Sequence, residues 1–192
     1  MKSNITLIGM PAAGKSSIGV VLAKRLNMNF LDVDLLIQQK HNKLLKEIIN
    51  EHGVDGFRKI ENDVNAELEL ENHVIAPGGS VIYGEKAMEH LKKISTVIYL
   101  ELSYYALRSR LGSLEERGVS LKEGQTLRDL YYERTPLYKK YADITINEMN
   151  KNMSRIIDEI IKLGLDDNEI ELLFKKLKIS CKIYNKEKTV RR

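Results

Sequence analysis

The stretch that decides the fold is "GMPAAGKSSIG", residues 9–19, which directly follows the apolar run "ITLI". Gly9, Gly14, Lys15 and Ser16 match the pattern G-x-x-x-x-G-K-[ST] at every position. Glycines at these points permit backbone angles that let successive N–H groups converge on phosphate oxygens, and the N-terminus of a following helix adds partial positive charge. The stretch therefore predicts a loop that binds the phosphates of a nucleoside triphosphate.

Within this loop the residue types suggest a division of roles. Lys15 is expected to reach the β- and γ-phosphates, and the hydroxyl of Ser16 is expected to ligate Mg²⁺. Other residues expected to contact the nucleotide are Gly9, Ala12, Ala13, Gly14 and Ser17. The alternative is a glycine turn that arose by chance, and the order of strand, loop and helix argues against it.

Composition and charge restrict the class of protein. The chain has 192 residues, of which 43% are hydrophobic and 30% charged, and its one cysteine excludes an internal disulfide framework. No apolar stretch approaches the ~18 residues of a membrane helix, and the N-terminus lacks the pattern of a secretory signal, so we expect a cytoplasmic protein. The net charge is +4, but residues 178–192 alone carry six Lys/Arg against one Glu. The rest of the chain therefore has no basic excess that would indicate nucleic acid, and the basic tail is interpreted as solvated.

β-Rich runs alternate with helical patterns along the whole chain. Strands are expected in the ranges 4–9, 29–34, 73–79, 95–103 and 143–147. Helices are expected in the ranges 15–26, 35–53, 54–72, 85–93, 104–113, 127–142 and 152–164, and a polar loop over 114–126. This alternation is typical of an α/β fold with parallel strands and crossover helices. We interpret residues 1–164 as one domain and residues 165–192 as an appended segment of helical and basic character.

Two carboxylates at the end of the second expected strand are candidates for phosphoryl-transfer chemistry. Asp32 and Asp34 are two residues apart, so on a strand they would share one face, at the edge where α/β folds place their sites. One would hold metal-bound water, and the other would accept a proton from the acceptor hydroxyl or orient it. Two solvated loop acids are the alternative interpretation.

Further along the chain, several residues are candidates for holding an anionic acceptor. Arg58 and Glu61 are three residues apart on an expected helix, where Glu61 would fix an Arg58 that forks onto a carboxylate. Gly78 and Gly79 follow a strand and would offer backbone N–H groups, while Arg134 precedes Pro136 and is a second candidate anchor. An exposed ion pair and an ordinary turn are the alternatives.

Two further groups complete the candidates from the residues alone. Arg117 lies in the polar loop, where a cation on a closing segment would neutralise developing charge. The tyrosines are interpreted as packing residues without chemistry, at positions 131, 132, 138 and 141.

Taken together, these segments resemble the shikimate kinase family over about residues 4 to 160. The matching pieces occur in the family's order and are "GMPAAGKSSIG", "FLDVD", "GFRKIENDV", "GGS", "LELS…LRSRLG", the Arg117 loop and "ERTPLYKKYAD". The resemblance implies a three-layer α/β/α P-loop kinase fold with a five-stranded parallel sheet and a mobile lid over about residues 112–125. It also implies ATP- and Mg²⁺-dependent phosphorylation of the 3-hydroxyl of shikimate, in the biosynthesis of aromatic amino acids.

The resemblance also implies roles position by position. Lys15 would contact phosphates, and Ser16 and Asp32 would serve Mg²⁺. Asp34 matches the family's ligand of the shikimate hydroxyl and its proposed base, and Arg117 matches the lid arginine. The remaining implied residues are the carboxylate-binding Arg58 and Arg134, the glycine motif Gly78–Gly79, and Arg110 near the adenine, with Lys151 as the nearest cation of the adenine-side loop.

Three segments depart from the family pattern. The usual triple glycine is Pro77-Gly78-Gly79, the usual Arg-Pro of the lid is Arg117-Gly118, and the adenine-side loop is "NEMNKNM". Proline has no N–H, so one backbone donor of the glycine motif is lost. Two alternatives to shikimate kinase therefore stay open. One is a related kinase for another small hydroxy acid such as gluconate, and the other is a binding module that uses nucleotide to switch. We expect a monomer that acts on a small molecule, without a nucleic acid or membrane partner.

Overall fold

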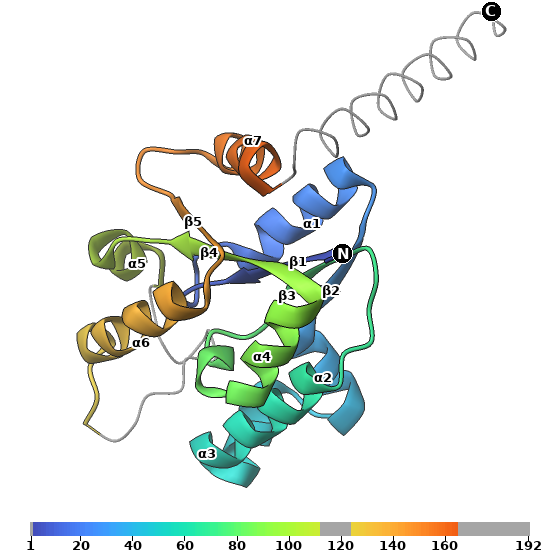
Figure 1. The fold of residues 1–192 in the computed structure, drawn as a ribbon. Helices are drawn as coiled ribbons and strands as arrows, with labels where there is room; N and C mark the ends of the chain where they lie inside the picture. Colours follow the sequence, from blue (N-terminus) through green and yellow to red (C-terminus); the bar gives the residue numbers. More distant parts are fainter. Residues whose placement is uncertain (1, 112–123, 165–192) are drawn as a thin grey trace, which may run out of the picture.

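A computed structural model describes residues 2–111 and 124–164 of the chain and places a five-stranded sheet at its centre (Figure 1). The strand order is β2-β3-β1-β4-β5, and every neighbouring pair is parallel. The strands are β1 (Asn4–Ile8), β2 (Asn29–Asp32), β3 (His73–Ala76), β4 (Ser95–Glu101) and β5 (Ile144–Asn147). The expected parallel α/β sheet is thereby confirmed. The predicted lid over 112–125, for the most part, and the appended segment 165–192 lie outside the described residues.

Helices cover both faces of the sheet and make the three expected layers. In the described part of the chain they are α1 (Lys15–Leu26), α2 (Val33–His41), α3 (Leu45–Ala66), α4 (Glu85–Ile94), α5 (Tyr104–Leu111), α6 (Leu127–Tyr141), α7 (Met153–Gly164) and the 3₁₀ turn η1 (Val81–Tyr83). Figure 1 shows α1 and α7 on one face of the sheet and α3, α4 and α6 on the other.

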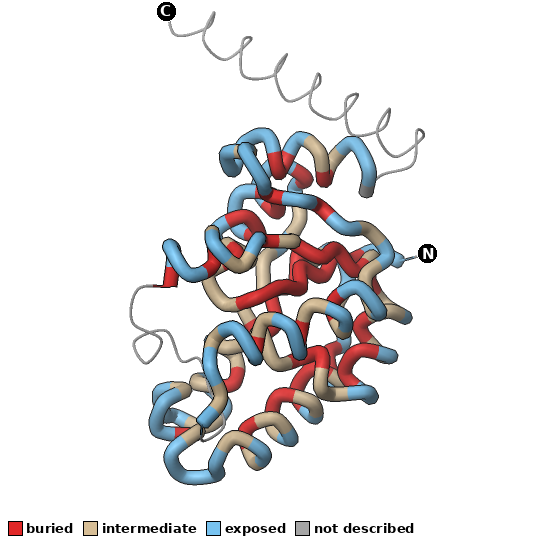
Figure 2. The backbone as a smooth tube through the Cα atoms, turned by 90° about the vertical axis from the view of Figure 1, so that its left-hand side faces the viewer, coloured by how far each residue is buried: buried red, intermediate tan, exposed pale blue. Residues whose placement is uncertain are grey.

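The central strands are apolar because both of their faces are covered. All five residues of β1 are buried, and successive side chains alternate between two cores. Leu7 packs in the core beneath α1 and α7, while Ile8 packs in the core beneath α2, α3, α4 and α6. The buried strands between exposed helix surfaces are visible in Figure 2.

This topology gathers the candidate residues at one edge. The glycine-rich loop follows β1, Asp32 ends β2, and Pro77 follows β3, so three turns leave the carboxyl ends of three adjacent strands. Open parallel sheets bind their ligands at this edge, near the point where the chain direction switches between the two halves of the sheet.

Several element boundaries differ from the expected ones. Strand β2 ends at Asp32, two residues earlier than predicted, and α2 begins at once. The predicted helix 35–53 is interrupted, because Asn42 takes a left-handed conformation with φ of 52° and α3 starts at Leu45. The predicted break near Gly53 is present as a kink, with φ of 69° inside α3. Among the described residues, no helix combines the length and apolar character needed to span a membrane.

Candidate active site

The loop between β1 and α1 has the backbone conformation that its glycines predict. Gly9 has φ of 153°, and a Cβ there would lie 2.8 Å from the carbonyl oxygen of Leu100, so a side chain would displace the loop from β4. Gly14, with φ of 81°, precedes α1 as its N-cap and supplies no side-chain cap. The first N–H groups of α1 are therefore left for an anion, together with the positive end of the helix dipole.

Lys15 is partly buried beneath this loop. Its Nζ donates hydrogen bonds to the carbonyl oxygens of Gly9 at 3.0 Å and Met10 at 3.3 Å. Burial lowers the pKa of Lys15, and the nearby carboxylate of Asp34 opposes this shift. The ammonium group is thus held against the inner side of the loop. Within residues 2–111 and 124–164, its hydrogen-bond partners are these two backbone carbonyl oxygens.

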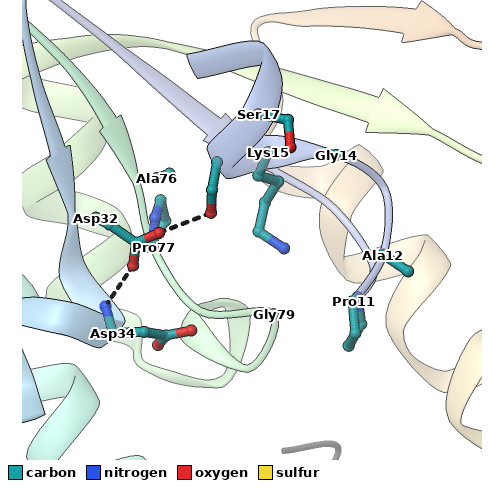
Figure 3. A pocket seen from close by; sticks show the side chains of 11 residues that line it. Pro11, Ala12, Gly14, Lys15, Ser17, Asp32, Asp34, Ala76, Pro77 and Gly79 are labelled. Carbon is teal, nitrogen blue, oxygen red and sulfur yellow. Dashed lines mark hydrogen bonds between the residues drawn. The ribbon is translucent and has the colours of Figure 1, made fainter. Parts of the chain in front are cut away.

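Ser16 and Asp32 form a hydroxyl–carboxylate pair where α1 and β2 meet. The Oγ of Ser16 donates to Oδ2 of Asp32 at 2.7 Å. The other oxygen of Asp32 caps α2 by accepting from the backbone N–H groups of Asp34 at 3.1 Å and Leu35 at 3.3 Å (Figure 3). The sequence predicted that Asp32 and Asp34 share a strand face, and this prediction is wrong, because the strand ends at Asp32. They come together because the strand turns directly into a helix.

The buried carboxyl group of Glu61 and the partly buried one of Asp34 both approach Gly78. A Cβ on Gly78 would lie 2.2 Å from Oε1 of Glu61 and 2.8 Å from Oδ1 of Asp34, so the bare backbone makes their approach possible. Burial raises the pKa of Asp34 to about 6, partly offset by Lys15. Burial likewise raises the pKa of Glu61 to about 7, a shift that the hydrogen bond from Ser80 opposes and the nearby Asp34 supports. Both groups titrate near neutral pH as a coupled pair.

The two candidate anchor arginines come from different helices and meet at one aromatic ring. Arg134 of α6 is 3% exposed, and within residues 2–111 and 124–164 no carboxylate lies within ion-pair distance of its guanidinium. Arg58 of α3 lies 3.7 Å from Asp55, and its buried Nε has no hydrogen-bond partner in that part of the chain. Both guanidinium groups lie over the ring of Tyr83. The expected contact between Arg58 and Glu61 is not formed: Oε2 of Glu61 accepts from Ser80 at 2.5 Å, and its Oε1 has no hydrogen-bond partner in the described part of the chain.

Two adjoining cavities connect these groups. The larger, of about 390 Å³, is lined by Pro11, Ala12, Gly14, Lys15, Ser16, Ser17, Asp32, Asp34, Ala76, Pro77 and Gly79 (Figure 3). The smaller, of about 40 Å³, is lined by Pro11, Asp34, Leu45, Ile49, Phe57, Glu61, Gly78, Gly79, Ser80 and Arg134. Asp34 and Gly79 belong to both cavities, whereas Arg58 is among the lining residues of neither. A molecule that spans the two would therefore reach Lys15 at one end and Arg134 at the other.

The remaining expected residues lie at the rim or elsewhere. Arg110 forms an ion pair of 2.7 Å with the buried Glu148 and lies 3.5 Å from the carbonyl of Ala12, which places it beside the phosphate loop. Lys151 is paired with Glu159 at 2.5 Å. Ala13 is fully buried, so in this conformation it offers no surface to a nucleotide. Arg117 lies outside the described residues.

Sequence reasoning missed three residues that shape this site. Tyr83 and Ser80 gave no signal, because their partners come from other elements. Tyr138, expected to be a packing residue, is buried and stacked on Tyr99, but its hydroxyl also donates to the carbonyl of Gly79 at 2.6 Å. Tyr132, also expected to pack, is 58% exposed, so that expectation is wrong.

Comparisons with known proteins agree with this geometry. A family model described as shikimate kinase matches residues 11–163. A shikimate kinase of Clostridium botulinum is 36% identical over 170 residues, covering 87% of this chain and 100% of the relative. One from Sulfurihydrogenibium is 33% identical over 159 residues, covering 82% and 95%.

Solved structures give the same result. The shikimate kinase from Acinetobacter baumannii in complex with shikimate superposes with a TM-score of 0.78 at 34% identity, covering 86% of this chain and 94% of that one. A gluconokinase from Sinorhizobium meliloti, at 14% identity and a TM-score of 0.53, shares the fold.

Proposed function

The chain belongs to the shikimate kinase family, and we propose that it transfers the γ-phosphoryl group of ATP to the 3-hydroxyl of shikimate. As a member of this family it is an ATP-dependent small-molecule kinase. The observation that carries the choice of acceptor is the buried Arg134, which has no carboxylate within ion-pair distance in residues 2–111 and 124–164 and lines the same small cavity as Asp34.

The argument for an anionic acceptor is one of charge. A buried guanidinium without a counterion is costly, so sites of this kind are completed by a ligand that brings the opposite charge. Arg58, with its unpaired buried Nε, lies beside the same ring and offers a second fork. A carboxylate accepts two parallel hydrogen bonds from such a fork, which suits the carboxylate of shikimate.

At the centre of the site, we propose that Asp34 handles the acceptor hydroxyl. It lines both cavities and has a pKa of about 6, so it is mostly ionised at neutral pH yet basic enough to take a proton. As the hydroxyl oxygen forms a bond to the γ-phosphorus and the bond to ADP breaks, the hydroxyl proton passes to Asp34. Lys15, whose Nζ points into the larger cavity, stabilises the charge on the transferring group (Figure 3). We also propose Arg117 for this role from the family pattern.

The residues also fit a magnesium ion. Mg²⁺ prefers hard oxygen ligands, keeps several waters, and is held by one or two protein groups plus substrate phosphates. The hydroxyl of Ser16 and the carboxylate of Asp32 offer such oxygens beside the phosphate loop, and the described residues contain no denser cluster of His, Cys, Asp and Glu that would form a full protein cage. When bound, the ion would supply positive charge to the β- and γ-phosphates. The backbone N–H groups at the start of α1 orient those phosphates.

A second acceptor is favoured by one observation. Pro77 lines the larger cavity and has no N–H, so the turn after β3 offers fewer backbone donors than a triple glycine would. A different small hydroxy acid, such as gluconate, would then be the acceptor on the same anchors. We further propose a cytoplasmic monomer, which light scattering of the purified chain and cell fractionation would test.

The test is an ADP-release assay with Mg-ATP and a panel of hydroxy acids. Shikimate is expected to give the highest kcat/KM. A plot of kcat/KM against pH is expected to fall below pH 6, because Asp34 becomes protonated there. Asp34→Asn is expected to lower kcat by about 10²–10⁴-fold and to leave the Kd for a non-hydrolysable ATP analogue nearly unchanged. Asp158→Asn, an exposed carboxylate on α7, is the control and should behave as the wild type. A near-normal rate for Asp34→Asn would remove Asp34 from the mechanism, and a preference for another acid would replace shikimate.

A further inference from the structure

We propose that Tyr83 is a positioning residue that holds the guanidinium groups of Arg58 and Arg134 at a fixed spacing, and so makes the acceptor site selective for a carboxylate. The inference rests on the proposed function and deepens it. Tyr83 is the last residue of η1, the short turn that follows Gly78 and Gly79, so it lies just behind the acceptor cavity.

The first contact is with Arg58. Its guanidinium carbon lies 4.0 Å from the centroid of the Tyr83 ring, close enough for the cation to rest on the negative face of the ring. The ion pair of Arg58 with Asp55 is long, at 3.7 Å, and the Asp55 side chain is 94% exposed. The Asp55 carboxylate thus lies in solvent, whereas the aromatic face is a partly buried support for the Arg58 guanidinium.

The second contact is with Arg134. Its Nε donates a hydrogen bond to the hydroxyl of Tyr83 at 3.3 Å, and its guanidinium carbon lies 5.3 Å from the centroid of the same ring. Because Nε is the nitrogen engaged by the tyrosine, Tyr83 does not occupy the terminal nitrogens of Arg134. One of them faces the glycine turn, since a Cβ on Gly79 would lie 3.2 Å from Nη1 of Arg134.

A third contact places the carboxylate of Glu133 next to the Tyr83 hydroxyl rather than on the arginines. The hydroxyl of Tyr83 donates to Oε1 of Glu133 at 2.6 Å while it accepts from Arg134. Burial and the bond to Glu133 raise the pKa of Tyr83, so the phenol stays neutral and keeps both roles. Glu133 thereby polarises the hydroxyl toward Arg134 through the phenol.

The consequence is a specific division of contacts. Two guanidinium groups near one another repel, and a carboxylate placed between them would relieve the repulsion but would also compete with the acceptor. A neutral aromatic ring stabilises both cations by its face and its hydroxyl, and does not occupy their outer N–H groups. The site is thus pre-organised for one incoming carboxylate, which reduces the ordering that binding would otherwise require.

The test compares Tyr83→Phe, Tyr83→Leu and the control Tyr105→Leu, which changes a tyrosine that is 82% exposed on α5. For each, the acceptor KM, the kcat and the Kd for a non-hydrolysable ATP analogue are measured, with thermal unfolding to verify folding. We expect the acceptor KM to rise about 3–10-fold for Tyr83→Phe and roughly 30–100-fold for Tyr83→Leu, by loss of one hydrogen bond and then of the ring as well. The kcat and the nucleotide Kd should stay within about twofold, since uniform acceptor binding is what is lost.

The decisive readout is discrimination between shikimate and its methyl ester, which lacks the negative charge. Wild type and Tyr105→Leu should favour the acid strongly, and Tyr83→Leu should lose most of this preference. A Tyr83→Leu enzyme that keeps the wild-type ratio, or that loses kcat at unchanged KM, would overturn the inference. If Tyr83→Leu unfolds, the smaller change in KM for Tyr83→Phe decides in the same way.

Failure of the proposed function gives a different pattern. If the wild type phosphorylates another hydroxy acid, shikimate is replaced, and the Tyr83 comparison is made with that acid and its ester. If the wild type neither phosphorylates nor binds any carboxylate of the panel, as measured by calorimetry, both proposals are overturned.

Discussion

At the acceptor end of the cavity, Glu61 is buried beside Asp34 and in contact with Ser80, and its pKa of about 7 lies above the ordinary 4.5. The folded chain therefore binds a proton that the unfolded chain releases between pH 4.5 and 7. This contribution to stability is complete below pH 4.5 and is lost as the pH rises through 7. Glutamine at this position cannot ionise, but it can still accept the hydrogen bond from Ser80.

We accordingly predict that Glu61→Gln gains stability over the wild type as the pH rises from 4.5 to 8. The gain in the free energy of unfolding is expected to be on the order of 2 kcal/mol, measured by urea denaturation at both pH values. The control is Glu69→Gln, which changes an exposed glutamate between α3 and β3. Parallel curves of stability against pH for Glu61→Gln and wild type would show that Glu61 has the same pKa in the folded and the unfolded chain.

Which single residues the sequence could predict depends on where their partners lie. Lys15, Ser16 and Asp32 belong to one strand–loop–helix motif and its neighbouring strand end, so residue type and local order were enough to place them at the site. Tyr83 was not predictable, because its position matters only when α3 and α6 bring an arginine each to the same ring. The spacing of Arg58 and Glu61 was misleading, since Arg58 lies nearest to the Asp55 carboxylate and Glu61 accepts from Ser80, nineteen residues further on.

At the scale of elements, a hydrogen bond joins α6 to the glycine turn after β3. The hydroxyl of the buried Tyr138 donates to the carbonyl of Gly79, and the same helix carries Arg134. We predict that Tyr138→Phe leaves the ring stack on Tyr99 in place, lowers the free energy of unfolding by about 1–2 kcal/mol, and raises the acceptor KM several-fold.

The measurements for Tyr138→Phe are urea denaturation and steady-state kinetics. The matched control is Tyr132→Phe on the same helix, whose side chain is largely exposed and whose change should alter neither quantity. An unchanged acceptor KM, with only the stability reduced, would mean that the glycine turn holds its conformation without α6.

Element boundaries were harder to predict than the elements themselves. Asp34 was assigned to the strand that ends at Asp32, whereas it lies in the first turn of α2. Asp32 is both the last residue of β2 and the N-cap of α2, because its side chain accepts from two backbone N–H groups of the helix. The break between α2 and α3 was missed because it is made by Asn42, which adopts the left-handed conformation that we expected only at glycine. At Leu44 the backbone N–H is taken up by Glu47 at 2.7 Å, so the second helix can begin without a capping side chain on that residue.

For the molecule as a whole, the order of strands and helices was predictable because alternation of β-rich runs and helical patterns restricts the chain to right-handed parallel crossovers. The five strands were predicted from the β-rich runs, whereas the P-loop kinase fold and the lid came from the family resemblance. The strand order β2-β3-β1-β4-β5 explains why residues distant in sequence meet at one edge. Residue types alone do not determine which helices pack against each other, so the meeting of α3 and α6 at Tyr83 could not be predicted.

The last prediction concerns the end of the chain. All five strands, both cores and both cavities are made within residues 2–164, and α7 closes one core with Ile156, Ile157 and Ile160. The family match ends at residue 163, at the end of that helix. We therefore predict that a chain ending at Gly164 folds and keeps its kcat/KM for shikimate within about twofold, because no contact described in the core or the site is removed.

A chain ending at Asn152, which also lacks α7, is the matched comparison. It exposes the apolar face of α1 and β5 and is expected to unfold at a much lower temperature, in thermal denaturation followed by circular dichroism. A chain ending at Gly164 that is folded but inactive would instead assign residues 165–192 a part in catalysis. Loss of folding in both chains would show that the kinase domain extends past α7, because the cores formed within residues 2–164 would then be insufficient to hold the sheet together.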